Sequence, residues 1–216
     1  MRELNAGYMT AMLEGKYTDR FLAEAGADAP EFTDEDMQAI GSPVDIVGTN
    51  IYMAHHIVRA SEGEPGFELI PYQPTHPNSP YPGVPLAIKF TPEAMYWGTR
   101  LLVDLWDVDE IYITETGGPF AHEPDAGDVQ PDLDGVENDS DRVVWLRAYL
   151  AELQRATAEG VPVRGYFHWT LVDNWEWMAG FRPRFGLYRV DRETQERTPK
   201  LSAEFFREAA RQNAVV

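Results

Sequence analysis

The hydrophobic pattern of the first part of the chain predicts two helices ahead of the first strand. Residues 1–14 carry a rough stripe of apolar side chains at helical spacing. Residues 15–30 are broken by glycine and proline, and this pattern predicts a loop. Thr33 then opens a short helix with Asp36 at the capping-box position, and Pro43 ends it.

Three short apolar runs predict buried β-strands, at residues 44–48, 111–113 and 163–171. The run at 44–48 is bounded by residues that break regular structure, a pattern typical of buried parallel strands. Two stretches predict long loops. One is the proline-rich segment 61–85, and the other is the Gly/Pro/Asp-rich segment 117–139.

Three further helices are predicted between and after these strands. Thr91, followed by a proline and an acidic residue, supplies a hydroxyl cap for the first. Ser140 begins the second, which has one apolar face and ends at Gly160. Thr198 and the next proline begin the last, which continues through Ala209. Helices that alternate with strands indicate an α/β fold with a parallel sheet, in which sites form at the carboxyl ends of strands.

The charge and composition narrow the classes of function. The 216 residues have a formal net charge of −18, which disfavours binding to nucleic acids and anionic membranes. The chain has no cysteine and no apolar stretch long enough to span a membrane. Its N-terminus lacks the layout of a signal peptide, so we expect a cytoplasmic protein. His55 and His56 have no third ligand at metal-binding spacing, so we expect neither a metal nor another cofactor.

Two segments carry polar chemistry at predicted strand ends. Glu115 directly follows the second strand, where an unpaired buried carboxylate would be costly and therefore needs partners or a task. A carboxylate that simply emerges into solvent is the alternative. Residues 165–177 run from the third strand into tryptophans interleaved with Asp and Glu. Sugars need this mixture, because carboxylates accept their hydroxyls and flat rings cover their C–H faces.

These segments resemble glycoside hydrolase family 1 in sequence. Ile113-Thr114-Glu115-Thr116-Gly117 is similar to the Ile-Thr-Glu-Asn-Gly motif that holds that family's nucleophile. Residues 169–177, Trp-Thr-Leu-Val-Asp-Asn-Trp-Glu-Trp, resemble its Trp-Ser-Leu-Leu-Asp-Asn-Phe-Glu-Trp stretch, and residues 180–186 resemble its Gly-Tyr-x-x-Arg-Phe-Gly. Residues 45–52 and 194–200 also match family segments, in order and with matching spacing.

The resemblance implies a role for each matching residue. Glu115 would attack the anomeric carbon to form a glycosyl-enzyme, and Tyr52 would hydrogen-bond Glu115 and orient it. Five residues would bind the sugar. Asn50 would bond near the 2-hydroxyl, and Trp169 would lie under the ring. Glu176 would accept from the 4- and 6-hydroxyls, Trp177 would donate to the 3-hydroxyl, and Phe185 would line the pocket. A carboxylate at Glu176 favours glucosides, galactosides or fucosides over 6-phospho-sugars.

The sequence departs from the family in two respects. Thr116 replaces the asparagine beside the nucleophile, and we expect weaker activity from this change. The chain also has no Asn-Glu-Pro, the family's acid/base motif, although a retaining glycosidase needs a second carboxyl group. Only about three of the eight strands of a (β/α)8 TIM barrel can be placed, so residues 1–216 are expected to form a single incomplete barrel domain. The resemblance places them as the C-terminal portion, roughly strands six to eight.

An incomplete barrel would expose sheet edges and an uncovered interior. We therefore expect one partner besides a carbohydrate substrate, either a missing N-terminal half or a second copy of the chain. Three hypotheses remain open. The chain is part of a retaining β-glucosidase-like enzyme, a non-catalytic sugar-binding half-barrel, or an inactive fragment.

Overall fold

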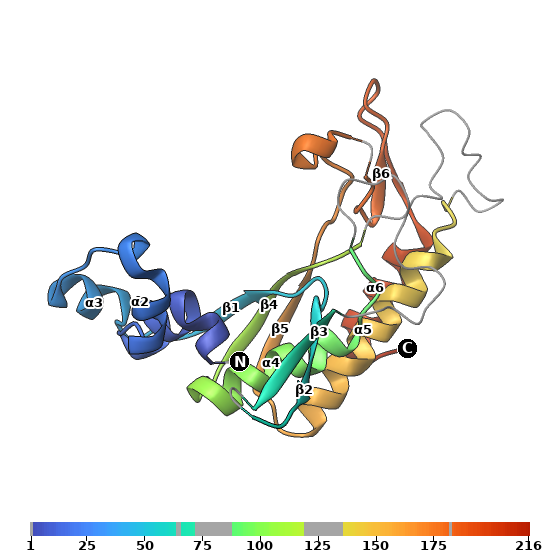
Figure 1. Ribbon diagram of the computed structural model, residues 1–216. Coiled ribbons are helices and arrows are strands. Elements are labelled where there is room, and N and C mark those ends of the chain that lie inside the picture. Colours follow the sequence, from blue (N-terminus) through green and yellow to red (C-terminus); the bar gives the residue numbers. More distant parts are fainter. Residues whose placement is uncertain (1, 64–65, 72–87, 119–135, 182) are drawn as a thin grey trace.

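A three-stranded parallel sheet forms the centre of the structure, a computed structural model that describes residues 2–63, 66–71, 88–118, 136–181 and 183–216. The strands lie in the order β1 (Val47–Asn50), β4 (Ile111–Thr116) and β5 (Val163–His168). Helices α4 (Glu93–Trp106), α5 (Ser140–Ala158) and α6 (Leu201–Gln212) lie on one side of it, as Figure 1 shows. The predicted α/β class, with parallel strands and crossover helices, is confirmed.

The N-terminal region is helical and projects away from the sheet (Figure 1). A continuous helical stretch comprises η1 (Glu3–Asn5), η2 (Ala6–Thr10) and α1 (Ala11–Glu14). The loop predicted over residues 15–30 is wrong, because α2 (Asp19–Ala25) and η3 (Gly26–Asp28) occupy most of it. The Thr18 hydroxyl caps α2 by accepting the Phe21 amide at 3.2 Å. The prediction overlooked this capping residue because it gave more weight to the flanking glycines. Helix α3 (Asp34–Ile40) begins with the predicted Thr33–Asp36 capping box.

The strand boundaries differ from the predicted ones at the edges of the sheet. β1 begins at Val47, and Val44 and Ile46, expected in a buried strand, are 62% and 49% exposed. A hairpin of β2 (His56–Ala60) and β3 (Phe67–Pro71) was not predicted, and β3 lies inside the segment 61–85 assigned to a loop. The hairpin has no buried residue to give it an apolar signature.

A second antiparallel pair precedes the last helix. It joins β6 (Tyr188–Val190) to β7 (Arg197–Pro199), and a 3-10 turn, η4 (Trp177–Ala179), lies earlier in the chain. Thr198 and Pro199, predicted to begin the last helix, instead pair in β7. The predicted hydroxyl cap at Thr91 is also wrong, because its oxygen accepts the Ala54 amide at 2.8 Å. Residues 72–87 and 119–135, in the two predicted long loops, lie outside the described residues.

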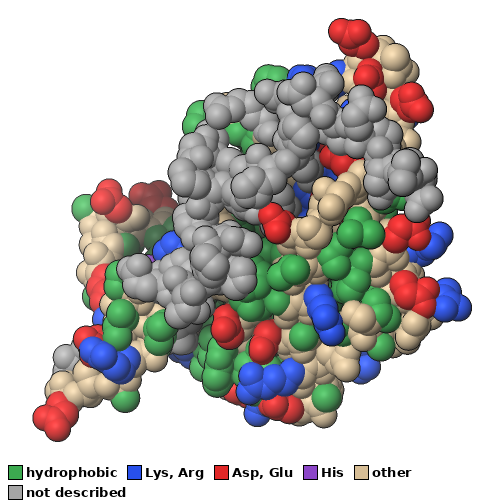
Figure 2. Space-filling view, turned by 90° about the vertical axis from the view of Figure 1, so that its right-hand side faces the viewer, with side chains coloured by type: hydrophobic (Ala, Val, Ile, Leu, Met, Phe, Trp, Pro, Cys, Tyr) green, Lys and Arg blue, Asp and Glu red, His purple; other side chains and the backbone are tan. Residues whose placement is uncertain are grey.

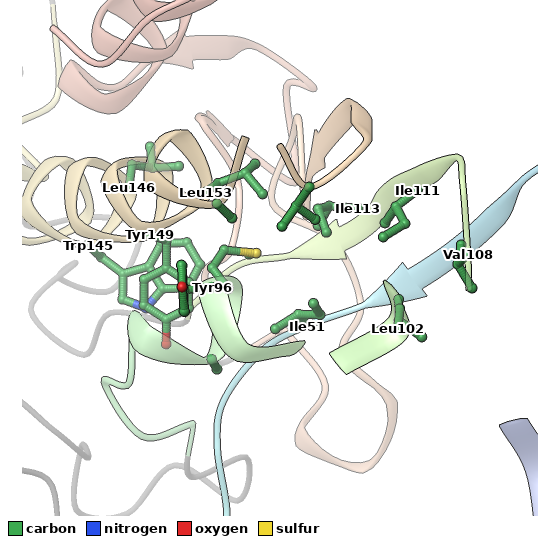
Figure 3. Close-up of a cluster of buried hydrophobic side chains, with 14 of the residues drawn as sticks. Ile51, Tyr96, Leu102, Val108, Ile111, Ile113, Trp145, Leu146, Tyr149 and Leu153 are labelled. Atoms are coloured by element: carbon green, nitrogen blue, oxygen red, sulfur yellow. The ribbon is translucent and has the colours of Figure 1, made fainter. Parts of the chain in front are cut away.

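The hydrophobic core lies between the sheet and the three helices, as Figure 3 shows. Ile111 and Ile113 of β4 are completely buried against it. Tyr149 of α5 is also fully buried, and its ring stacks on Trp145 with centroids 3.8 Å apart. Packing on this side alone explains why the apolar residues of β4 alternate along the strand.

The opposite face of the sheet has no covering layer in the part of the chain that the structure describes. Phe167 of β5 is 58% exposed there, and Gly48, Asn50 and Thr114 are exposed as well. The helix-bearing side, in contrast, shows acidic and basic side chains interspersed around apolar ones (Figure 2). Among the described helices, none is long and apolar enough to cross a membrane. One face of the sheet is therefore available to another layer.

His168 at the end of β5 is buried against the helices. Its ring lies edge-on to Trp145, with centroids 6.4 Å apart, and 6.0 Å from the ring of Phe206. Within the described residues, neither ring nitrogen has a hydrogen bond of ordinary geometry, although the backbone of Phe185 favours the charged form. Burial, with the positive charges of Arg142 and Lys200, lowers the pKa of His168 to about 3. The residue thus packs as a neutral ring.

Acid should therefore destabilise the protein partly through His168. With a folded pKa of about 3, below the unfolded value of 6.5, the unfolded chain binds a proton that the folded chain does not. Stability then falls as the pH drops from about 6.5 towards 3. Between pH 7 and 5, the native protein should lose roughly 2 kcal/mol more than the His168→Phe variant in urea denaturation. The His55→Phe variant, changed at an exposed position, is the control, and equal losses in all three proteins would contradict the prediction.

Candidate active site

The carboxyl ends of β1 and β4 place Asn50 beside Glu115. The two residues are register partners across the strands, with an irregularity between Thr49 and Asn50. Asn50 Nδ2 donates to Glu115 Oε2 at 3.0 Å. Thr114 Oγ1 donates to Asn50 Oδ1 at 2.7 Å, which fixes the orientation of the amide. The carboxylate thus emerges from the sheet beside an oriented donor.

Tyr52 supplies a second donor to the same carboxylate oxygen. Its hydroxyl donates to Glu115 Oε2 at 2.9 Å, the bond that the family resemblance implies. The backbone carbonyl of Tyr52 accepts from the buried hydroxyl of Tyr149 at 3.0 Å. The same hydroxyl accepts the Thr91 amide at 3.0 Å. Helix α5 therefore holds the segment that follows β1, and through it the Tyr52 hydroxyl.

The electrostatics of this group favour a protonated phenol at Tyr52. Burial first, and then the hydrogen bond and negative charge of Glu115, raise the pKa of Tyr52 well above its usual range. Tyr52 is therefore protonated at neutral pH and can donate to Glu115. Within the described residues, Glu115 Oε1 accepts no hydrogen bond, so one oxygen of the carboxylate is available to a ligand.

Trp169 and Glu176 form a second group beyond the end of β5. The Trp169 indole Nε1 donates to Glu176 Oε1 at 3.1 Å. Trp169 is itself joined to β4, because its amide donates to the Thr116 carbonyl at 2.8 Å. The peptide bond between Trp169 and Thr170 is cis. One backbone hydrogen bond therefore joins Trp169 to Thr116, the residue after Glu115.

Glu176 is buried, only 4% exposed, and the charge of Glu115 acts on its pKa. Burial raises its pKa, the hydrogen bond from Trp169 opposes this, and the charges of Glu115 and Asp173 add to the rise. Because one carboxylate acts on the other, the two groups belong to one electrostatic environment. A ligand with several hydroxyls could donate to both.

Phe185 and Trp177 differ in how the structure places them. Phe185 is 2% exposed, and its carbonyl accepts the Thr170 amide at 3.3 Å, so it lies beside the Trp169 group. Trp177 begins η4, has a positive φ of 48° and is 81% exposed. The structure therefore brings six of the seven candidate residues into two adjacent groups and leaves the Trp177 ring in solvent.

Gly117 allows the ends of β4 and β5 to approach closely. A Cβ atom at this position would lie 1.9 Å from the Trp169 carbonyl oxygen. The two nearest atoms, the carbonyl oxygen and carbon of Trp169, belong to the backbone, so they cannot move without shifting the chain after β5. Thr116, the departure from the family pattern, is fully buried, and its Oγ1 has no hydrogen-bond partner among the described residues. No contact in the structure reports whether it alters the site.

Sequence reasoning missed the residues that orient the candidates. Thr114 lies within the quoted motif, and its hydroxyl could have been recognised as an internal partner for Asn50. Tyr149 gave no signal, because its helical position was consistent with ordinary packing. Asp173 was part of the aromatic motif, yet its partners Lys200 and Gly186 are distant in the chain. Among the described residues, no three His, Asp or Glu side chains gather to hold a metal ion.

Known proteins are similar to this chain in both sequence and fold. The family model described as "Glycosyl hydrolase family 1" matches residues 1–215. A 1,4-beta-D-glucan glucohydrolase from Thermotoga neapolitana is 29% identical over 96% of this chain and 44% of its own length. Beta-glucosidase A from Thermotoga maritima is 30% identical with the same coverage. A structure of the beta-glucosidase from Thermotoga maritima in complex with azafagomine superposes with a TM-score of 0.77, at 28% identity, over 100% of this chain and 47% of that one. The chain thus spans less than half the length of these relatives.

Substituting Gly117 should separate the ends of β4 and β5. In Gly117→Ala, the new methyl group would overlap the Trp169 carbonyl, and overpacking between backbone atoms costs about 1–3 kcal/mol or more. We expect a lower thermal midpoint and changed tryptophan fluorescence. Gly98→Ala in α4 is the matched control, because its methyl group would meet only the flexible end of Ile51, at 2.9 Å. A Gly117→Ala variant as stable as Gly98→Ala would contradict this account.

Proposed function

Because the chain belongs to glycosyl hydrolase family 1, we propose that it carries the nucleophile half of a retaining β-glycosidase of β-glucosidase type. The observation that carries the proposal is the Glu115 carboxylate, held at the end of β4 by donors from Asn50 and Tyr52. A retaining glycosidase needs an oriented carboxylate of this kind for its first step. The named activity of the relatives, β-glucosidase, supports glucosides as the substrate class.

In the proposed mechanism, Glu115 attacks the anomeric carbon of a β-glycoside. The two hydrogen bonds on Oε2 hold the carboxylate in place and leave Oε1 to form the bond to carbon. The bond to the aglycone oxygen breaks as the new ester forms, and the acid/base supplied by another segment would protonate that oxygen. Water, deprotonated by the same group, then displaces Glu115, and the two inversions give net retention of configuration. Tyr52, kept protonated by its neighbours, stabilises Glu115 as the leaving group of this second step.

The second group is proposed to bind the sugar. Trp169 lies under the ring, and the Trp169 indole orients Glu176 to accept from the 4- and 6-hydroxyls. Asn50 bonds near the 2-hydroxyl, Phe185 lines the pocket, and Trp177 turns in to donate to the 3-hydroxyl when sugar binds. A buried carboxylate at Glu176 would repel a 6-phosphate, which favours unphosphorylated glucosides, galactosides or fucosides.

We further propose that residues 1–216 form the C-terminal portion of one TIM-barrel domain, with β1, β4 and β5 as strands six to eight. The matching motifs and the similarity to TIM-barrel β-glucosidases support this assignment. The sequence holds no Asn-Glu-Pro, so the acid/base and the remaining strands would come from another polypeptide segment. Those strands would pair with the outer edges of β1 and β5, and the open face around Phe167 would then face the barrel interior.

A non-catalytic sugar-binding half-barrel is the second candidate function. The hydrogen-bonded Trp169–Glu176 pair favours it, since this pair would bind sugar without any acid/base. Sugar affinity without turnover would separate this function from catalysis, and the absence of both would indicate an inactive fragment.

The activity test uses 2,4-dinitrophenyl β-glucoside with and without azide. This leaving group departs as the phenolate without acid assistance, and azide attacks the glycosyl-enzyme without a general base. We expect azide to raise dinitrophenolate release by about an order of magnitude. Glu115→Ala should abolish the release, and glycosyl azide should accumulate only with the native chain.

Tyr52→Phe serves as the graded variant in the same assay. Loss of one hydrogen bond to a charged group costs about 1.5–3 kcal/mol, so the rate should fall about 10- to 100-fold. Equal release by the native chain and by Glu115→Ala would reject Glu115 as the nucleophile.

The uncovered face of the sheet should make the isolated chain associate. Without the rest of the barrel, the apolar ring of Phe167 is exposed on this face, so we expect light scattering to give a mass above the 24.5 kDa of one chain. Phe167→Asp should restore the single-chain mass. Val144→Asp is the matched control, because Val144 is 52% exposed on helix α5, on the other side. A monomeric native chain that binds no apolar dye would show that this face needs no cover.

A further inference from the structure

A group of buried charges lies beneath residues 173–186, the loop that carries Glu176 and Trp177. Asp173 Oδ1, at the start of this loop, accepts from the Lys200 ammonium at 3.1 Å and from the Gly186 amide at 2.9 Å. Lys200 is fully buried just before α6. One carboxylate oxygen thus connects the first residue of the loop to its last residue and to a helix start.

The far end of the loop is tied to the other helix. The Arg184 carbonyl accepts from Arg142 of α5 at 2.6 Å. The guanidinium of Arg184 itself lies 3.8 Å from Asp173 Oδ2. Arg142 is fully buried and paired with Asp139, which also accepts the Ser202 amide of α6 at 2.8 Å. The starts of α5 and α6 therefore hold both ends of the loop.

The tip of the loop has far fewer anchors than its ends. Trp175 is 62% exposed and Met178 is 99% exposed, while Glu176 is held by Trp169 and by turn hydrogen bonds. At the base, Gly186 leaves no room for a side chain, because a Cβ atom would lie 2.3 Å from the Asp173 amide nitrogen. The path of the backbone towards Glu176 is therefore set where the loop begins and ends.

Buried ion pairs are poor devices for stability alone. The cost of removing two charges from water offsets most of their attraction, and apolar side chains of similar size often do as well. What such a pair adds is geometric specificity, because a carboxylate that accepts from two fixed donors restricts the backbone that carries it. A pair of this kind at the base of a ligand-binding loop acts on the position of that loop.

We propose that Asp173 and Lys200 are positioning residues that set the sugar-facing loop 173–186. The pair does not touch the sugar. It fixes the loop base so that Glu176 meets Trp169 and the sugar hydroxyls. This proposal rests on the proposed function for its consequence, sugar affinity, but not for the structural link itself.

The test compares Lys200→Met, Asp173→Asn and the double variant in the full chain. Hydrogen exchange measured by mass spectrometry reports on residues 173–186 directly. Azide-assisted hydrolysis of 2,4-dinitrophenyl β-glucoside reports KM and kcat separately. Arg207→Met is the matched control, because Arg207 forms an exposed ion pair with Glu204 on α6, with 72% of its side chain exposed.

In the single variants, we expect exchange in the loop to rise about tenfold or more, while β4 keeps its protection. KM should rise by a similar factor and kcat should stay within about threefold, since the nucleophile is untouched. The double variant removes both charges, so its thermal midpoint should return towards that of the native chain, while KM stays raised. Arg207→Met should change neither quantity.

The two readouts separate this proposal from the proposed function. If the native chain shows no turnover and no azide effect, the proposed function fails, and faster loop exchange in the variants still supports the positioning pair. Unchanged loop exchange in Lys200→Met and Asp173→Asn would overturn the pair. So would a double variant in which KM recovers together with the thermal midpoint, because that result describes a purely structural role.

Discussion

The register between β1 and β4 is the constraint on which the candidate site depends. It sets Asn50 opposite Glu115, so that the amide and the Tyr52 hydroxyl both reach one carboxylate oxygen. A carboxylate at the end of a buried strand is costly without such partners, and here they come from a neighbouring strand. A shift of one residue would turn Asn50 to the other face and leave Glu115 without its amide donor.

One-sided packing of the sheet gives the structure one buried face and one open face. Ile111, Ile113 and Tyr149 bury the helix-facing side, and the Tyr149 hydroxyl reaches across to hold the segment of Tyr52. The other face, with Phe167 exposed, carries no layer among the described residues. The core thus packs against one face of the strands, and the candidate site lies at their carboxyl ends.

Charge is distributed unevenly between the surface and the interior of this acidic chain. The whole sequence has a formal charge of −18, yet the base of the loop 173–186 gathers Arg142, Arg184 and Lys200 around Asp139 and Asp173. The positive charges of Arg142 and Lys200 also help to keep His168 neutral. Paired charges thus lie at the base of the loop that carries Glu176, while aromatic rings surround the neutral His168 at the end of β5.

The sequence by itself determined the α/β class, the parallel order of strands and helices, and the candidate residues at strand ends. Alternating apolar positions report burial directly, and the motif around Glu115 is local in the chain. It did not determine the hairpin β2–β3, which buries no residue, or helix α2, whose cap lies among glycines. Only the tertiary structure decided that Tyr149 holds Tyr52 and that Lys200 pairs with Asp173. These contacts join residues far apart in the chain, and neither periodicity nor spacing records which distant side chains folding will bring together.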